Sequence, residues 1–80
     1  MDNFLGQIEL FAYAYAPMGW VLCNGAIINI VQNTALYSLI GIQFGGDGRT
    51  TFGLPNMTNM SPTPGMEYYI AVTGIYPTRD

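Results

Sequence analysis

Residues 44–56, FGGDGRTTFGLPN, come closest to a site that could do chemistry. Closely spaced glycines beside Arg49 are typical of loops that bind phosphate, and Asp47 could be a metal ligand. A P-loop requires G-x-x-x-x-G-K-[ST], but the only basic residues of this chain are two arginines. An EF-hand requires several oxygen ligands at alternate positions, and the segment offers only Asp47. We therefore predict a structural loop, in which glycines take positive φ and Asp47 caps a turn. Its residues are Gly45, Gly46, Asp47, Gly48 and Arg49.

Other catalytic and metal-binding constellations are also missing. Without any histidine, a serine or cysteine nucleophile lacks its usual base. The acids Asp2, Glu9 and Glu67 are isolated in the sequence, whereas glycoside hydrolysis requires two carboxylates in one pocket. One cysteine and no histidine exclude the usual zinc and transition-metal sites. We predict a non-enzyme with no cofactor, in which Cys23 is a buried, unreactive thiol.

The composition indicates that part of the apolar surface is covered by another protein chain. Half of the 80 residues are hydrophobic and only 9% are charged. A chain this short cannot bury so much apolar side chain alone, so part of it should lie in an interface. The net charge is −3, and two separated arginines cannot bind nucleic acid. No apolar run is long enough to span a membrane, and the first residues do not resemble a signal peptide.

Periodicity predicts a single domain of strands with one short helix. Residues 6–12 alternate between apolar and polar positions and predict a strand. Asn24-Gly25 separates two apolar runs and predicts a hairpin with a type I′ turn. Asn33 and Gly41 are candidate N-cap and C′ residues of a helix of two to three turns.

The second half of the chain is expected to supply a strand that pairs in one sheet with the N-terminal strand. Phe52 and Leu54 should point to one side of an extended segment, and residues 57–66 form a proline-containing loop. Residues 67–80 contain a second alternating strand, which should share a sheet with residues 6–12 because neither edge can remain unpaired. The predicted fold is a small α+β domain with a mainly antiparallel sheet, the Asn-Gly hairpin and one short helix. Residues 1–56 are its expected core, followed by residues 57–66 and 67–80.

Several motifs at fixed spacing resemble the phage tail collar domain, in the form found in microcystin-dependent-like proteins. The family pattern contains G-E-I-x-L-F-A, P-x-G-W-x-x-C-[DN]-G, N-x-A-L-[FY]-x-L-[LI]-G and [YF]-G-G-D-G-x-T-T-F-x-L-P-[DN]. These correspond to residues 6–12, 17–25, 33–41 and 44–56, and the ending YIAVTGIYPTR is also similar.

The resemblance implies a structural module of tail fibres and similar appendages, commonly trimeric, with receptor binding in its longer distal parts. Family members usually carry a long segment before the last strand, often with a His-x-His metal motif. Here that segment shrinks to MTNMSPTPGM without a histidine. The chain is therefore expected to be a minimal form, in which the metal site is not carried over and receptor binding through that segment is in doubt.

Two functions follow from these observations. The first is a subunit that assembles with itself into a trimer, fibre or filament of a virion tail or extracellular appendage, where it could also contact other tail or appendage proteins. The alternative is a module that binds a glycan or another cell-surface receptor through its tyrosines. Assembly predicts large particles in electron micrographs, whereas recognition predicts discrete oligomers that bind selected glycans. The expected interface residues are aromatic: Phe4, Phe11, Tyr13, Tyr15, Tyr68, Tyr69 and Tyr76. The expected core residues are Trp20, Cys23, Leu36, Leu39, Phe52 and Leu54.

Overall fold

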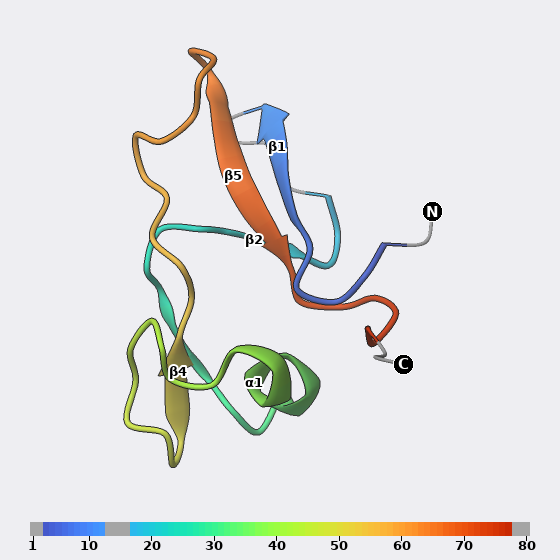
Figure 1. Ribbon diagram of the computed structural model, residues 1–80, viewed down its shortest axis with the longest axis vertical. Helices are drawn as coiled ribbons and strands as arrows, with labels where there is room; N and C mark the ends of the chain where they lie inside the picture. The colour runs from blue at the N-terminus through green and yellow to red at the C-terminus, as the bar shows by residue number, and fades with distance from the viewer. Residues whose placement is uncertain (1–2, 13–16, 78–80) are drawn as a thin grey trace.

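The computed structural model describes residues 3–12 and 17–77 of the chain. Short strands and one short helix make up this part, which confirms the predicted α+β class (Figure 1). The predicted loop ends one residue early, since Met66 already belongs to the last strand. The elements are β1 (Ile8–Ala12), β2 (Trp20–Leu22), β3 (Ile27–Asn29), α1 (Thr34–Ile40), β4 (Thr51–Gly53) and β5 (Met66–Ala71).

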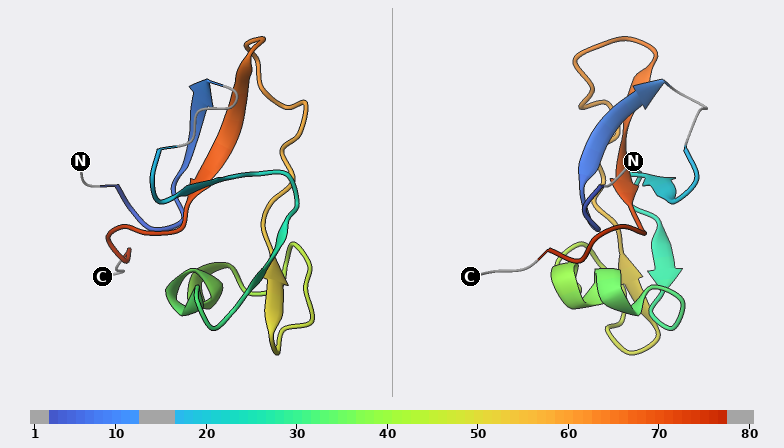
Figure 2. Two further views of the ribbon diagram at one scale, coloured as in Figure 1. Left: turned by 180° about the vertical axis from the view of Figure 1, so that it is seen from behind. Right: turned by 90° about the vertical axis from the view of Figure 1, so that its right-hand side faces the viewer.

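Three strands form an antiparallel sheet in the order β1-β5-β2 (Figure 2). The central strand β5 places Ile70 opposite Ile8 of β1 and opposite Val21 of β2. The two terminal strands therefore share one sheet, as the sequence predicts. Because β5 is the last strand of the chain and the centre of the sheet, this sheet depends on contacts between distant parts of the sequence.

The strands on either side of Asn24 and Gly25 do not form the predicted hairpin. β2 pairs with β5, whereas β3 pairs with β4, so the two strands lie in different sheets. A type I′ turn needs positive φ at both central residues, but of these two only Gly25 has it, at 81°. The Asn24 side chain instead accepts the Ala26 N–H at 3.1 Å, and Gly25 donates its N–H to the Pro55 carbonyl at 3.2 Å. The dipeptide is thus a corner that carries the chain from one sheet to the other.

The helix α1 lies between the two residues predicted as its caps. Asn33 occupies the N-cap position but makes no side-chain capping bond there; its Nδ2 donates to the Asn29 carbonyl at 3.0 Å. Gly41, with φ of 60°, donates its N–H to the Tyr37 carbonyl at 2.8 Å and closes the last turn. Leu36 is the buried residue of the helix. A helix of seven residues depends on this packing, since isolated helices of that length are unstable in water.

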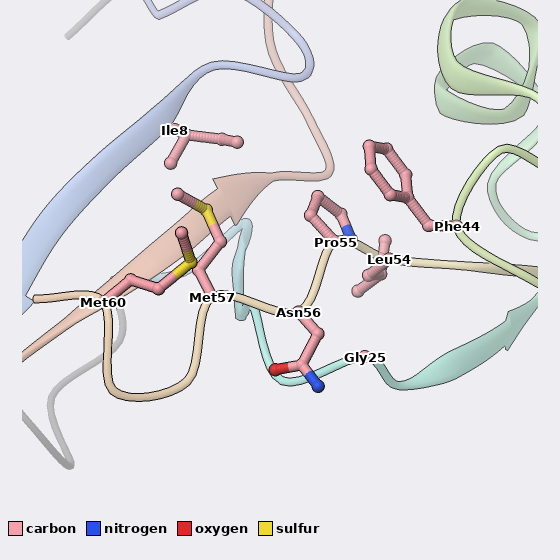
Figure 3. A pocket seen from close by; sticks show the side chains of 8 residues that line it. All are labelled: Ile8, Gly25, Phe44, Leu54, Pro55, Asn56, Met57 and Met60. Carbon is pink, nitrogen blue, oxygen red and sulfur yellow. The ribbon is translucent and has the colours of Figure 1, made fainter.

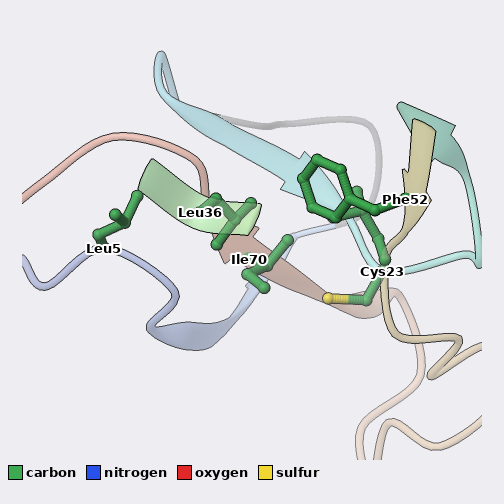
Figure 4. Close-up of a cluster of buried hydrophobic side chains, with 6 residues drawn as sticks. Leu5, Cys23, Leu36, Phe52 and Ile70 are labelled. Atoms are coloured by element: carbon green, nitrogen blue, oxygen red, sulfur yellow. The ribbon is translucent and has the colours of Figure 1, made fainter. Parts of the chain in front are cut away.

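One hydrophobic cluster joins the two sheets and the helix (Figure 4). Side chains from β4, β5, α1 and the segments beside them meet there, so the core couples both halves of the fold. Leu39 is partly buried against the cluster. The buried members are Leu5, Cys23, Leu36, Phe52, Leu54 and Ile70, four of which are among the expected core residues.

Trp20 does not lie in this cluster, which corrects the expectation that it is a core residue. Successive side chains of a strand point to opposite faces of the sheet. Val21 packs against the core, so Trp20 points to the other face. There its ring lies edge-to-face with Phe11, with centroids 5.1 Å apart, and it stays partly exposed.

Candidate functional site

The glycine-rich loop before β4 is organised around the carboxylate of Asp47. Its Oδ1 accepts the main-chain N–H groups of Arg49 and Thr50, both at 2.8 Å, and of Thr51 at 3.0 Å. Its Oδ2 accepts the Thr50 hydroxyl at 3.0 Å. Converging N–H groups of this kind are what a phosphate-binding loop offers to its ligand. Here the protein's own carboxylate occupies them, which is the arrangement expected of a structural loop.

These hydrogen bonds hold the pKa of Asp47 well below its usual range. The largest contribution is the main-chain N–H of Thr51, followed by those of Arg49 and Thr50 and the Thr50 hydroxyl. Each bond favours the charged carboxylate over the neutral acid. Arg49 thus contacts Asp47 through its main chain, and no side-chain ion pair between the two is present in the part of the chain that the structure describes.

The glycines of this loop are required by backbone geometry, as predicted. Gly45, Gly46 and Gly48 have φ values of 126°, 91° and 74°, which L-residues with a side chain rarely adopt. At Gly46 the backbone of β4 also passes very close. A Cβ built there would lie 2.7 Å from both the Phe52 nitrogen and the Thr51 carbonyl oxygen.

Tyr37 ties the helix to this loop, a role that the sequence analysis missed. Its ring lies 5.3 Å from that of Phe52, and its hydroxyl donates to the Gly48 carbonyl at 3.3 Å. Tyr37 directly follows the buried Leu36, so the helical period alone does not show which way its side chain points. The [FY] position of the collar pattern was the available signal.

Cys23 is buried, and its environment makes it a poor nucleophile. Burial raises the pKa of its thiol to about 11. The thiolate is the reactive form, so the thiol is almost wholly protonated at neutral pH. Within the described residues no cluster of three metal-ligating side chains is present.

An apolar hollow of about 680 Å³ lies where the two sheets meet (Figure 3). Ile8 of β1 forms one side, and the side chains before and after β4 form the other. Met57 and Met60 come from the loop 57–66, to which the sequence analysis gave no role. None of the described residues that line the hollow is charged, and Ile8, Phe44 and Met60 are each more than a third exposed. The lining residues are Ile8, Gly25, Phe44, Leu54, Pro55, Asn56, Met57 and Met60.

The aromatic residues expected at an interface do not share one environment. Phe4 and Tyr76 are exposed, and Phe4 lies beside the exposed Ile75 in an isolated bridge. We call Phe4, Ile75 and Tyr76 the terminal patch. Tyr69 is only 4% exposed, so it is already packed within the chain and does not fit the expected role of an interface residue. Phe11 and Tyr68 are partly buried, and Tyr13 and Tyr15 lie outside the described residues.

The described residues include no helix that is both long enough and apolar enough to cross a lipid bilayer. This finding agrees with the short helix of the fold.

Comparison with known proteins finds a family. The Phage Tail Collar Domain family matches residues 6–62, which is well over half of the chain. The range contains β1 to β4, the Asp47 loop and all the residues that line the apolar hollow. The chain therefore belongs to the phage tail collar domain family, as the resemblance predicted. Comparison with the curated proteins and with the solved structures finds no significant match.

Membership indicates a structural role in the phage tail fibre, because the family is structural rather than enzymatic. It agrees with a loop whose carboxylate is used internally and with a thiol that is buried and protonated. It also implies association with other tail proteins or with copies of the same chain.

Proposed function

We propose that this chain is a self-assembling structural subunit: one collar-type domain that forms a trimer, fibre or filament in a virion tail or a similar extracellular appendage. On this proposal the chain has no catalytic activity of its own. Self-association is its function, and its main partner is a second copy.

The observation that carries the proposal is the exposed apolar surface. The hollow and the terminal patch together present large hydrophobic side chains from both halves of the fold. Among them, Phe4 is 55% exposed and Met60 is 61% exposed. Large apolar patches exposed on a surface mark sites of protein association, and on this proposal these side chains form such patches. Covering them contributes about 25 cal/mol per Å² of apolar surface, before the costs of association are subtracted.

Charge also supports association between copies. The lining residues of the hollow are uncharged, and the whole chain has a net charge of only −3. Repulsion between copies is therefore weak. If the terminal patch of one copy packs in the hollow of the next, the contact joins two different surfaces. Such a contact closes into a ring such as a trimer when the rotation permits, and otherwise grows into a filament.

The hollow is tested by placing a charge in it. In Met60→Glu the new carboxylate would have to be buried without a partner on assembly, whereas in the free subunit it stays in water because Met60 is exposed. Val31→Glu is the matched control, since Val31 is 84% exposed and lies outside both the hollow and the terminal patch. We expect Met60→Glu to sediment as a monomer and Val31→Glu to assemble like the wild type. Assembly of Met60→Glu at wild-type concentrations would show that the hollow is not the contact.

A further inference from the structure

A second hollow, of about 550 Å³, lies on the face of the three-stranded sheet that points away from the core. Ile8 pairs with the buried Ile70, so the alternation of β1 sends Glu9 and Phe11 to the opposite face, and Gln7, just before the strand, lines the same hollow. Trp20 of β2 and Asn3 also line this hollow, together with Pro17 and Met18, and we call it the aromatic cleft. The cleft thus differs from the apolar hollow in its face and in its chemistry.

Aromatic rings form the floor of the cleft. Phe11 lies edge-to-face with Trp20, with ring planes at 80°, and with the buried Tyr69, with centroids 5.7 Å apart. These contacts hold the indole of Trp20 in place while it remains partly exposed. A fixed indole is a flat apolar platform whose ring face carries partial negative charge. It attracts the weakly positive C–H groups on one face of a sugar ring.

Polar side chains beside the platform are held in position by hydrogen bonds. The Gln7 Oε1 accepts the Phe4 N–H at 2.9 Å, and its Nε2 donates to the Glu9 Oε2 at 2.6 Å. The Asn3 Nδ2 donates to the carbonyls of Phe4 and Thr73 at 3.2 and 3.0 Å. Glu9 Oε1 and Asn3 Oδ1 accept no hydrogen bond from the described residues, so both can accept one from a ligand. Fixed acceptors lose little conformational entropy when a ligand binds.

The charge of the cleft selects the ligand. Among the described residues that line it, Glu9 is the one ionisable side chain and none is basic. Anionic ligands such as phosphates and acidic sugars are therefore excluded by repulsion. A quaternary ammonium group would suit the indole and the carboxylate, but it has no proton to donate to the Asn3 Oδ1. A neutral ligand with an apolar face and neighbouring hydroxyl groups fits both the platform and the two acceptors.

We propose that the aromatic cleft binds a neutral pyranose ring, which stacks on Trp20 and donates hydroxyl protons to Glu9 and Asn3. A single sugar ring offers few contacts, so we expect a dissociation constant on the order of 1 mM. Repeating the cleft along an assembled fibre would raise the avidity for a surface that carries many such sugars. The lining residues named above belong to one chain, so binding can be tested on the free subunit as well as on an assembly.

Trp20 is the single tryptophan of the chain, so its fluorescence reports directly on the cleft. The experiment titrates the purified protein with methyl β-glucopyranoside, methyl β-galactopyranoside and N-acetylglucosamine, with choline chloride as a separate arm. The wild type is compared with Glu9→Gln, which removes the charge at an exposed position. Glu67→Gln is the matched control, because Glu67 lies on the same face of the sheet but outside the cleft. Sedimentation of the same samples reports their oligomeric state, so a failure of assembly is seen separately from a failure to bind sugar.

We expect a saturable change in Trp20 emission with at least one pyranose, unchanged in Glu67→Gln. Glu9→Gln should bind at least about tenfold more weakly, since it loses a hydrogen bond to a charged group. Three results would overturn the proposal. They are no saturation with any of the three sugars up to about a hundred times the expected dissociation constant, saturation with choline alone, or equal sugar affinities in the wild type and Glu9→Gln.

Discussion

At the scale of single residues, the Asp47 carboxylate organises more of the chain than any other side chain of the glycine-rich loop. Three main-chain N–H groups and one hydroxyl donate to it. In most proteins a cluster of N–H groups like this is a place to look for a bound anion. In this chain the carboxylate makes the anion unnecessary, and the loop shapes the approach to β4.

The bonds to Asp47 predict a dependence of stability on pH. Its pKa is lowered in the folded state, so its contribution is fully present above the unfolded pKa of about 4 and is lost as the pH falls through the folded value. Asp47→Asn keeps an acceptor oxygen but removes the charge, and should unfold at lower urea concentration than the wild type at pH 7. The difference should shrink as the pH falls below about 4. Glu67→Gln makes the same change of charge on β5, and an equal loss in that variant would contradict the role given to Asp47.

The close approach of the backbone at Gly46 leads to a second prediction for a single residue, on the stability of the fold. Gly46→Ala should cost about 3–5 kcal/mol of unfolding free energy, because it combines a strained φ with a clash against the backbone of β4. Gly65 is the control, since its φ of 82° is similar but a Cβ there meets nothing within 4 Å. Gly65→Ala should cost only about 1–2 kcal/mol, the strain of the backbone alone. Urea unfolding of both variants measures the difference, and equal costs would contradict the close approach.

At the scale of elements, the sequence predicts structure where the signal is local. The helix between Asn33 and Gly41 and the alternating strands at both ends follow from periods of 3.6 and 2. The hairpin at Asn24-Gly25 fails because strand partners are chosen by distant residues. The Pro55 carbonyl and strand β5 offer bonds to this region that no local pattern contains.

The same contrast between local and distant signals holds for the glycine-rich loop, the two hollows and Trp20. The glycine geometry and the turn-capping role of Asp47 were predicted, because each depends on residues next to one another in the sequence. The two hollows were not predicted, since each collects side chains from separate elements. Trp20 was misplaced for a related reason: whether it or Val21 faces the core depends on which face of the sheet packs against the hydrophobic cluster, and the other members of that cluster come from distant parts of the chain.

Because β5 is the central strand, we expect alanine substitutions at two residues that lie opposite each other to lower the unfolding free energy by different amounts. Ile70 is 1% exposed and in the core, whereas its partner Ile8 lies on the outer strand β1 and is 38% exposed. Ile70→Ala should cost about 2–5 kcal/mol of unfolding free energy, and Ile8→Ala about 1 kcal/mol. Thermal or urea unfolding of the two variants tests this. Equal costs would show that β5 is not the centre of the sheet.

At the scale of the whole molecule, the chain has a small core and a large apolar surface. Six buried side chains form the main cluster, and further large hydrophobic side chains remain exposed in the hollow and the terminal patch. An 80-residue chain buries only about 60–65% of its unfolded surface on folding alone. Association would bury more of it, and would connect the stability of the subunit to its concentration.

The most direct test of self-assembly is sedimentation velocity of the purified wild-type chain over a range of micromolar concentrations. We predict species much larger than the 8.8 kDa subunit, with a distribution that moves to larger species as the concentration rises if the assembly is open. A closed trimer would instead give one species of three subunits. A single, soluble 8.8 kDa species at every concentration would contradict the proposed function.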